Sequence, residues 1–244
     1  MLQHTRGIVL RSVKYGESSL ITAIFTEHFG VQSYLVQGVR SSKSRNNKAA
    51  LLQPASLLEL VAYQKEQKNL QRLKEFQTAH IYASMQEEVV RNSVALFSVE
   101  LLLRLLPEHA PQPELFNACF EYFIQVDRMP IDQLGNLPLW FVIYCSDALG
   151  YELKGNHSTE TPHLHLQEGG YSDHPPISRP FVSEEDGKAL SDLLKVDDLN
   201  EVWKVSMHAS MRYRLLDWYL EFLHQHSQHL GTIKSLPVLR AILH

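Results

Sequence analysis

Short hydrophobic runs separated by glycine and polar turns fill the first 77 residues of the chain. These runs lie at residues 5–13, 20–26, 31–37, 57–63 and 70–76. Gly16 and Gly30 mark turns, and the polar stretch 64–69 predicts a hairpin between the last two runs. Five short strands gain from closing on themselves, because closure leaves no unpaired edge. The pattern predicts an N-terminal five-stranded β-barrel of the OB type, with an SH3-like barrel as the alternative.

After residue 78 the hydrophobic period changes to that of α-helices. One apolar stripe comprises Met85, Val89, Asn92, Leu96, Val99, Leu103 and Leu106. Further helices are predicted at residues 114–126, 137–149, 183–194, 202–223 and 235–243. The segment 137–149 is apolar nearly all round, which predicts a central position. We therefore expect an α+β protein with a barrel domain at residues 1–78 and a mainly α-helical domain at residues 79–244.

Residues 150–182 interrupt the helical pattern with glycines and prolines, which predicts an irregular insert. Four histidines lie in it, near Glu160, Glu168 and Asp173: His157, His163, His165 and His174. On a strand, His163 and His165 would point to the same face and could form a pair of metal ligands. The chain has 13 histidines, so a local cluster is not surprising, and it has no His-Glu-x-x-His framework. Metal binding at these four histidines stays open, and no cofactor is expected.

The charge of the chain is divided unevenly along its length. The whole chain has a formal net charge of -4, yet residues 1–80 hold eleven Lys and Arg against five Glu, a net +6. The remaining residues therefore carry a net -10. A basic segment joined to an acidic remainder favours a polyanion partner for the N-terminal part. Charge drift for solubility is the simpler alternative.

A basic loop between the third and fourth predicted strands is the first candidate for phosphate binding. It contains four cations and no acidic or apolar residue: Arg40, Lys43, Arg45 and Lys48. Lys and Arg on such a loop can follow a flexible phosphate backbone. Arg6, Arg11 and Lys14, from the same barrel, could extend the track. A solvated linker without function is the alternative interpretation.

Aromatic side chains beside these cations could stack on bases, which stabilises single-strand complexes by about 1–3 kcal/mol per base. The candidates are Tyr15, Phe25, Phe29, Tyr34 and Tyr63. Each could instead belong to the barrel core. Phe25 sits inside an apolar strand and is expected in the core, whereas Tyr15 lies in a turn. We select Tyr15 and Tyr34 as candidate DNA-binding residues.

The sequence shows no assembled catalytic constellation. The glycines Gly30, Gly38, Gly150 and Gly155 are isolated rather than grouped in a phosphate-binding loop. No Gly-x-Ser-x-Gly elbow is present. This absence argues against an enzyme. A metal-dependent hydrolase that uses the histidine-rich insert, with the barrel delivering substrate, is the alternative.

Both cysteines are expected to be core thiols, because Cys119 and Cys145 fall on apolar helix faces. Two cysteines cannot make a disulfide framework, which suits a reducing cytoplasm. Residues 1–10 lack a signal layout, and the longest apolar run, residues 137–144, is far shorter than the roughly 20 residues of a membrane span. We expect a soluble cytoplasmic protein without a membrane partner.

The C-terminal helices carry a candidate surface for a protein partner. Arg212, Arg214 and Lys234 could receive an acidic peptide tail. An apolar floor would come from Trp203, Trp218 and Leu236. Ordinary helix packing with a basic exposed face is the alternative.

An ordered set of short motifs resembles the bacterial recombination mediator family RecO. The N-terminal motifs are Thr5-Arg6-Gly7, Tyr15-Gly16-Glu17-Ser18, Phe25-Thr26-Glu27 with Gly30, Gly38-Val39-Arg40, Lys43-Ser44-Arg45 and Leu52-Gln53-Pro54. The C-terminal motifs are Arg214-Leu215-Leu216, Tyr219-Leu220 and Lys234-Ser235. The resemblance covers the whole chain in order, although each motif alone is weak.

This resemblance implies an N-terminal OB-fold, a helical domain and a DNA repair function without catalysis. Such proteins bind single- and double-stranded DNA and anneal complementary strands. They engage the acidic C-terminal tail of the single-strand-binding protein, and with RecR they help load RecA onto coated strands. The implied DNA contacts are the basic loop and Arg6 or Arg11. Association with the nucleoid is expected, and a protein-only adaptor that touches no nucleic acid is a further alternative.

The chain departs from the family in the zinc module that many members carry. That module uses two Cys-x-x-Cys pairs after the central helix. The corresponding stretch here has no cysteine, and Asp173 and Pro176 stand about where the second pair belongs. Either packing holds the insert or histidines substitute for the missing ligands. We expect packing and no zinc.

Overall fold

The computed structural model describes residues 1–40, 48–65, 68–177, 179–227 and 230–243. The chain divides into two compact units. The first comprises residues 1–86 and 106–127, and the second comprises residues 87–105 and 128–244. The predicted domain boundary at residue 78 falls at the end of a strand, and the first unit also includes the later segment 106–127.

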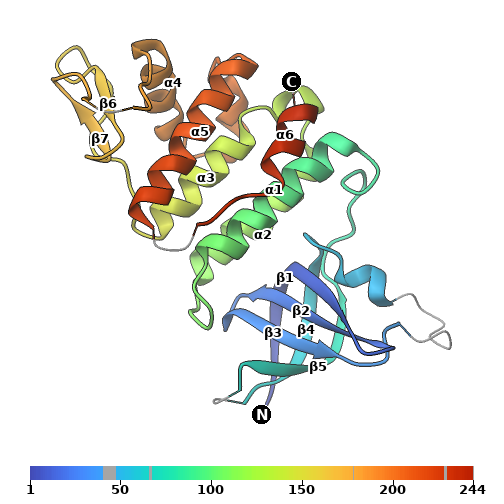
Figure 1. Cartoon of the computed structure of the whole chain (residues 1–244). Coiled ribbons are helices and arrows are strands. Elements are labelled where there is room, and N and C mark those ends of the chain that lie inside the picture. The colour runs from blue at the N-terminus through green and yellow to red at the C-terminus, as the bar shows by residue number, and fades with distance from the viewer. Residues whose placement is uncertain (41–47, 66–67, 178, 228–229, 244) are drawn as a thin grey trace. The chain divides into compact units, whose positions relative to one another are not determined.

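Five strands of the first unit form a closed barrel in the order β1-β2-β3-β5-β4 (Figure 1). The strands are β1 (Leu2–Tyr15), β2 (Ser19–Thr26), β3 (Gly30–Val36), β4 (Leu57–Tyr63) and β5 (Leu70–Thr78). The β3–β5 pair is parallel and the other pairs are antiparallel. A 3-10 turn, η1 (Lys48–Leu52), precedes β4. This barrel confirms the predicted five-stranded OB-type fold.

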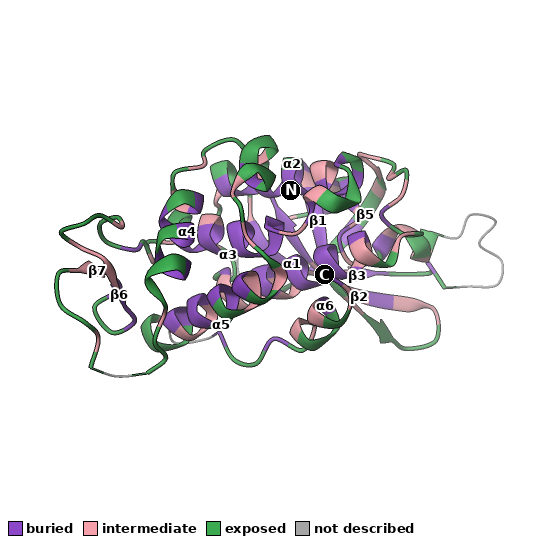
Figure 2. Cartoon of the chain, turned by 90° about the horizontal axis from the view of Figure 1, so that it is seen from above, coloured by how far each residue is buried: buried purple, intermediate pink, exposed green. Residues whose placement is uncertain are grey.

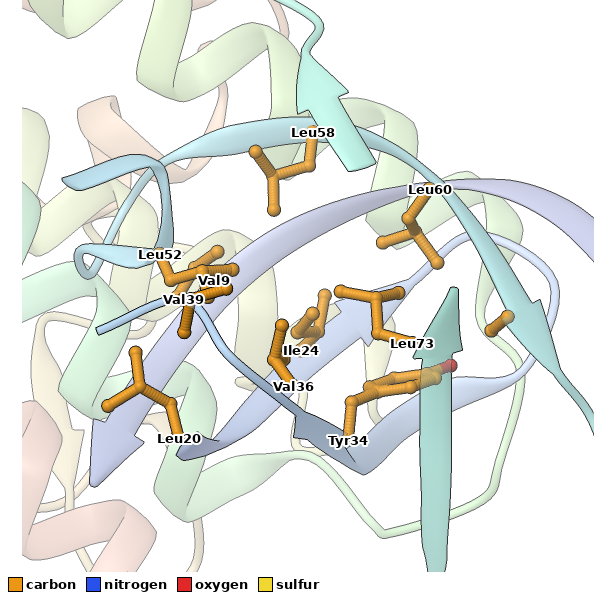
Figure 3. Close-up of a cluster of buried hydrophobic side chains, with 11 residues drawn as sticks. Val9, Leu20, Ile24, Tyr34, Val36, Val39, Leu52, Leu58, Leu60 and Leu73 are labelled. Carbon is orange, nitrogen blue, oxygen red and sulfur yellow. The ribbon is translucent and has the colours of Figure 1, made fainter. Parts of the chain in front are cut away.

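The barrel interior is filled by alternating side chains from every strand, as a period of two requires. Figure 3 shows this cluster, in which Ile24, Tyr34, Val36 and Leu73 point inward together. A bulge between Val9 and Arg11 shifts the register of β1 against β2. Because a bulge changes the alternation, it turns Arg11 onto the outer face.

The segment 106–127 packs against one end of the barrel. There, His109 donates its backbone N–H to the carbonyl oxygen of Val31 at 3.0 Å. Gly30 has φ +65°, and a Cβ on it would lie 2.3 Å from the carbonyl oxygen of Ala110. The helix α2 (Pro113–Arg128) then places the ring of Phe116 edge-on against Phe25, with 5.3 Å between centroids. Glycine at position 30 therefore makes this close approach possible.

The second unit is helical. Its helices are α1 (Val89–Leu105), α3 (Leu137–Ala148), α4 (Glu184–Leu194), α5 (Ala209–His226) and α6 (Leu236–Ile242), with short 3-10 turns η2 (Ile131–Gln133) and η3 (Leu199–Lys204). The helix α3 is buried on most of its surface (Figure 2), as predicted for a central helix. The side chain of Ser183 accepts the N–H of Asp186 and caps α4.

Three helix predictions were wrong in detail. The stripe predicted for α1 includes Val89 and Leu96, which are 64% and 39% exposed. The helix instead buries residues on several sides, so its period gives no single stripe. Met85 precedes α1, and Val202 lies in η3 rather than in the long helix, which begins at Ala209. Cys119 and Cys145 are buried thiols, as predicted.

The insert is a small hairpin in an irregular segment. Its strands are β6 (His163–His165) and β7 (Gly170–Ser172). Gly170 passes close to the backbone of Lys154, where the N–H of Lys154 bonds the carbonyl oxygen of Gly169 at 2.8 Å. Among the described residues, no helix has both the length and the apolar character needed to cross a membrane.

Candidate nucleic-acid interface

One row of outward side chains crosses the barrel from strand to strand. The register pairs Val13 with Ile21, Ile21 with Leu35, Leu35 with Arg72, and Arg72 with Tyr63. Arg11 stands beside this row, paired with Ala23 on β2. We call this surface the sheet face; it comprises Arg11, Val13, Ile21, Leu35, Tyr63 and Arg72. Because the row takes one residue from each strand of the closed barrel, it forms a band of outward polar and apolar side chains round the barrel.

The sheet face combines free cations with accessible apolar and aromatic groups. Arg11, Arg72, Val13 and Tyr63 are exposed. In the described part of the chain, no carboxylate forms an ion pair with Arg11 or Arg72. Exposed cations together with an exposed aromatic ring suit a polyanion that carries bases.

The β1–β2 hairpin extends the sheet face at the barrel end opposite Gly30. Tyr15 on this hairpin is 54% exposed, and Lys14 is exposed beside it. The backbone N–H of Arg40 donates to the carbonyl oxygen of Ser18 at 3.1 Å, which holds the start of the basic loop against the hairpin. Arg40 therefore lies next to the hairpin that carries Lys14 and Tyr15. Their DNA contacts stay a prediction.

Of the other three predicted cations of the basic loop, one lines a groove and two lie outside the described residues. Lys48 lines a groove of about 640 Å³ together with Arg6. Three glutamates line the same groove: Glu27, Glu59 and Glu75. Those carboxylates make the surroundings of Lys48 less favourable to phosphate than the sheet face. Lys43 and Arg45 lie outside the described residues.

Arg6 has a role within the protein that the sequence did not predict. Its Nε and Nη2 donate to the two carboxylate oxygens of Glu27 at 2.9 and 2.8 Å, and Nη2 also donates to Oδ1 of Asn117 at 2.5 Å. The guanidinium lies over the rings of Phe116 and Phe120, 5.4 and 5.0 Å from their centroids. Hydrogen bonding to Glu27 raises the pKa of Arg6. Because Glu27 compensates its charge, we do not include Arg6 among the proposed phosphate-binding residues.

The structure corrects the selection of Tyr34 as a candidate DNA-binding residue. Its side chain is fully buried in the barrel core, and its hydroxyl donates to Oε1 of Gln32 at 2.9 Å. Burial raises the pKa of this phenol. A ring enclosed on both faces cannot stack on a base, so Tyr34 serves the core.

Arg72 and Tyr63 are the functional candidates that our selection from the sequence omitted. The signal was present in the alternation of Leu70 to Leu73, which puts Arg72 opposite the buried Leu73. The β4–β5 hairpin adds two exposed cations, Lys65 and Lys68. The buried amide of Gln71 donates to the carbonyl oxygens of both, at 2.9 and 2.8 Å. These two hydrogen bonds fix the backbone positions from which the lysine side chains extend.

The predicted partner-binding cations have different surroundings. Arg214 donates two 2.7 Å hydrogen bonds to Asp186, which is 2% exposed, and so ties α5 to α4. The half-buried Arg212 donates to the carbonyl oxygen of Met207 at 2.7 Å, and burial lowers its pKa. Lys234 is exposed. These contacts make Lys234 the better candidate for an acidic tail, and that role stays a prediction.

The expected apolar floor for such a tail is not a single surface. Trp218 is buried, whereas Trp203 is exposed on η3. Arg214 and Trp218 line a groove of about 420 Å³ with Phe181. Asp186, Asp217 and Glu221 line the same groove. This lining would repel an acidic tail, so it does not favour the predicted arrangement.

Comparisons with known proteins cover both units. Residues 1–82 match the family described as Recombination protein O N terminal, and residues 86–237 match Recombination protein O C terminal. The DNA repair protein RecO of Flavobacterium psychrophilum is 31% identical over 242 residues, which are 98% of each chain. The proteins of that name from Azobacteroides pseudotrichonymphae and Christiangramia forsetii are 26% and 27% identical, with 99% of each chain covered. The chain therefore belongs to the RecO family of DNA repair proteins.

Proposed function

We propose that this protein is a non-enzymatic mediator that binds single- and double-stranded DNA and anneals complementary strands. The observation that supports this most strongly is the sheet face. It carries the exposed cations Arg11 and Arg72 and the exposed side chains of Val13 and Tyr63 on the outside of a closed five-stranded barrel. Barrels of this type bind oligonucleotides on their outer sheet and adjoining loops.

The cations act by compensating phosphate charge. Each Lys or Arg that contacts a phosphate releases a condensed counterion, which favours binding at low salt. Two strands held at one cationic surface repel each other less, so their bases meet more often. Tyr15 and Tyr63 offer ring faces on which unpaired bases stack. The protein then lowers the barrier to annealing without making or breaking a covalent bond.

The helical unit supplies partner contacts in this proposal. It engages the acidic C-terminal tail of the single-strand-binding protein, and Lys234 is the exposed cation that we assign to that contact. Together with RecR, the protein helps load RecA onto coated single strands. Membership of the RecO family supports these partners.

Annealing of complementary strands coated with single-strand-binding protein tests the proposal. We expect Arg11→Ala/Arg72→Ala to slow annealing at least tenfold, and the quadruple change of Arg40, Lys43, Arg45 and Lys48 to Ala to weaken DNA binding about equally for any sequence. Lys188→Ala/Arg128→Ala is the matched control, because it removes two exposed cations from the helical unit.

Two results would contradict the proposal. One is annealing by the sheet-face variant at the rate of the control. The other is a wild-type protein that binds DNA as poorly as its loop variant, which would favour a protein-only adaptor.

A further inference from the structure

Three potential ligand groups meet at the β6–β7 hairpin of the insert: His165, Glu168 and His174. Nδ1 of His165 lies 3.4 Å from Oε1 of Glu168, and Nε2 of His174 lies 3.5 Å from the same oxygen. All three ligand atoms are within 4.8 Å of one another. Bonds of about 2.1 Å from a tetrahedral metal put neighbouring ligand atoms about 3.4 Å apart. Two of the ligand–ligand distances of such a site are therefore already present.

The other ring nitrogens are held in the orientation that metal ligation needs. Nε2 of His165 lies 2.5 Å from the carbonyl oxygen of His174. A carbonyl oxygen only accepts, so Nε2 carries the proton and the lone pair of Nδ1 faces Glu168. Nδ1 of His174 lies 3.0 Å from a carboxylate oxygen of Asp173 and 2.8 Å from the hydroxyl oxygen of Ser172, and these contacts hold the ring with Nε2 toward Glu168. Hydrogen-bond partners of the ring nitrogen that does not bind the metal orient metal-ligating histidines in this way.

The hairpin is a built scaffold for this cluster. His165 is 5% exposed, whereas Glu168 and His174 are exposed at its outer side. The N–H of Tyr171 donates to the carbonyl oxygen of Lys154 at 2.9 Å, which anchors β7 to the segment before the hairpin. One side of the cluster is therefore fixed, and the other is open to an ion and to a water ligand.

The four-cysteine zinc module of many RecO proteins does not fit this chain. The two cysteines of this chain, Cys119 and Cys145, are buried on α2 and α3, outside the insert. Any metal bound here would use a different donor set. His163, the residue that the sequence paired with His165, is not one of the three grouped residues.

We propose that His165, Glu168 and His174 form a divalent transition-metal site of two imidazoles and one carboxylate, with Zn²⁺ as its ligand. This donor set suits Zn²⁺, and solvent would complete the coordination. The ion would join β6 to the segment after β7, where packing alone was expected to hold the insert. The site is independent of the proposed DNA contacts, which lie on the other unit.

Equilibrium dialysis of the full-length protein against Zn²⁺, with metal analysis, tests the site. We expect one equivalent of Zn²⁺ to bind tightly. His174→Ala and Glu168→Gln should each weaken binding at least tenfold, and Asp173→Ala about tenfold through loss of the carboxylate that orients His174. His163→Ala is the matched control, since it removes a histidine of the same strand. The exposed positions of Glu168 and His174 make these variants mild for folding.

Replacement of Zn²⁺ by Co²⁺ gives a second readout, because a tetrahedral Co²⁺ site absorbs visible light. The wild type and His163→Ala should show this absorption, and His174→Ala should lose it. The proposal is overturned if the wild type binds no stoichiometric zinc. Equal zinc binding by His174→Ala and His163→Ala would overturn it too, because the thirteen histidines would then bind zinc without a defined site.

Discussion

Arg6 on β1 and Glu27 in the β2–β3 turn form a two-pronged ion pair, with donor–acceptor distances of 2.9 and 2.8 Å. The pair connects two strands, and Asn117 extends it to α2. Arg6 is therefore a structural cation, whereas Arg11 and Arg72 are exposed on the sheet face. This distinction between compensated and free cations defines the proposed DNA interface better than net charge does.

Arg6→Ala should lower the free energy of unfolding by roughly 1–3 kcal/mol, because it removes charge-assisted hydrogen bonds and leaves Glu27 without its guanidinium. Urea unfolding measures this loss. DNA affinity, measured under conditions where the variant is folded, should change less than it does for Arg72→Ala. A fully stable Arg6→Ala protein with a large loss of affinity would show that Arg6 contacts DNA after all.

Tyr15→Ala should weaken single-strand binding by about 1–3 kcal/mol per lost stack and leave its salt dependence unchanged. The reason is that Tyr15 is an exposed ring without charge. Fluorescence anisotropy at several salt concentrations measures both quantities. The comparison variant is Tyr34→Phe, which should alter stability and leave affinity intact, since Tyr34 is in the core. Equal losses of affinity for the two variants would contradict this assignment.

The barrel was accessible to sequence reasoning because its strands alternate with a period of two between clear turns. The paired Arg6 was not, because in a sequence it resembles any other arginine, and Glu27 is 21 residues away. Tyr34 and Tyr63 show the same limit: both lie on predicted strands, and the register alone places one ring inside and the other outside. The α1 stripe failed because that helix is buried on several sides.

Gly30→Ala should destabilise the first unit by roughly 2–4 kcal/mol. The new Cβ would meet the backbone of Ala110 at 2.3 Å, and the positive φ would add strain. Gly16→Ala is the matched control: it also has a positive φ, but no atom of the described residues lies within 4 Å of its Cβ, so we expect a loss of about 1 kcal/mol. Thermal unfolding measures the two. A similar loss of stability for both variants would mean that the close approach of Ala110 adds nothing to the cost of a Cβ at position 30.

Glu100 should make the stability of the helical unit depend on pH. Burial opposes its ionisation, but its carboxylate accepts the backbone N–H groups of Lys234 and Ser235 at 2.9 and 2.8 Å, and the net effect lowers its pKa. A pKa that is lower in the folded state gives stability that is full above the ordinary value of 4.5 and is lost as pH falls through the folded value.

Glu100→Gln should therefore reduce stability by about 1–2 kcal/mol near neutral pH and remove part of the acid sensitivity below pH 4.5. Urea unfolding between pH 3 and 7, with Glu221→Gln as the control, would measure both effects. An unchanged pH profile would show that the contact with Lys234 and Ser235 contributes nothing.

The most direct test of the proposed interface is the salt dependence of binding to an oligo-dT strand, measured by fluorescence anisotropy. For about five phosphate contacts, log affinity should fall against log salt with a slope of roughly -3 to -4. Arg11→Ala/Arg72→Ala should reduce the size of that slope by about 1.4, whereas Lys188→Ala/Arg128→Ala should leave it unchanged. A wild-type slope near zero, or equal changes in the two variants, would contradict a phosphate-binding sheet face on the barrel.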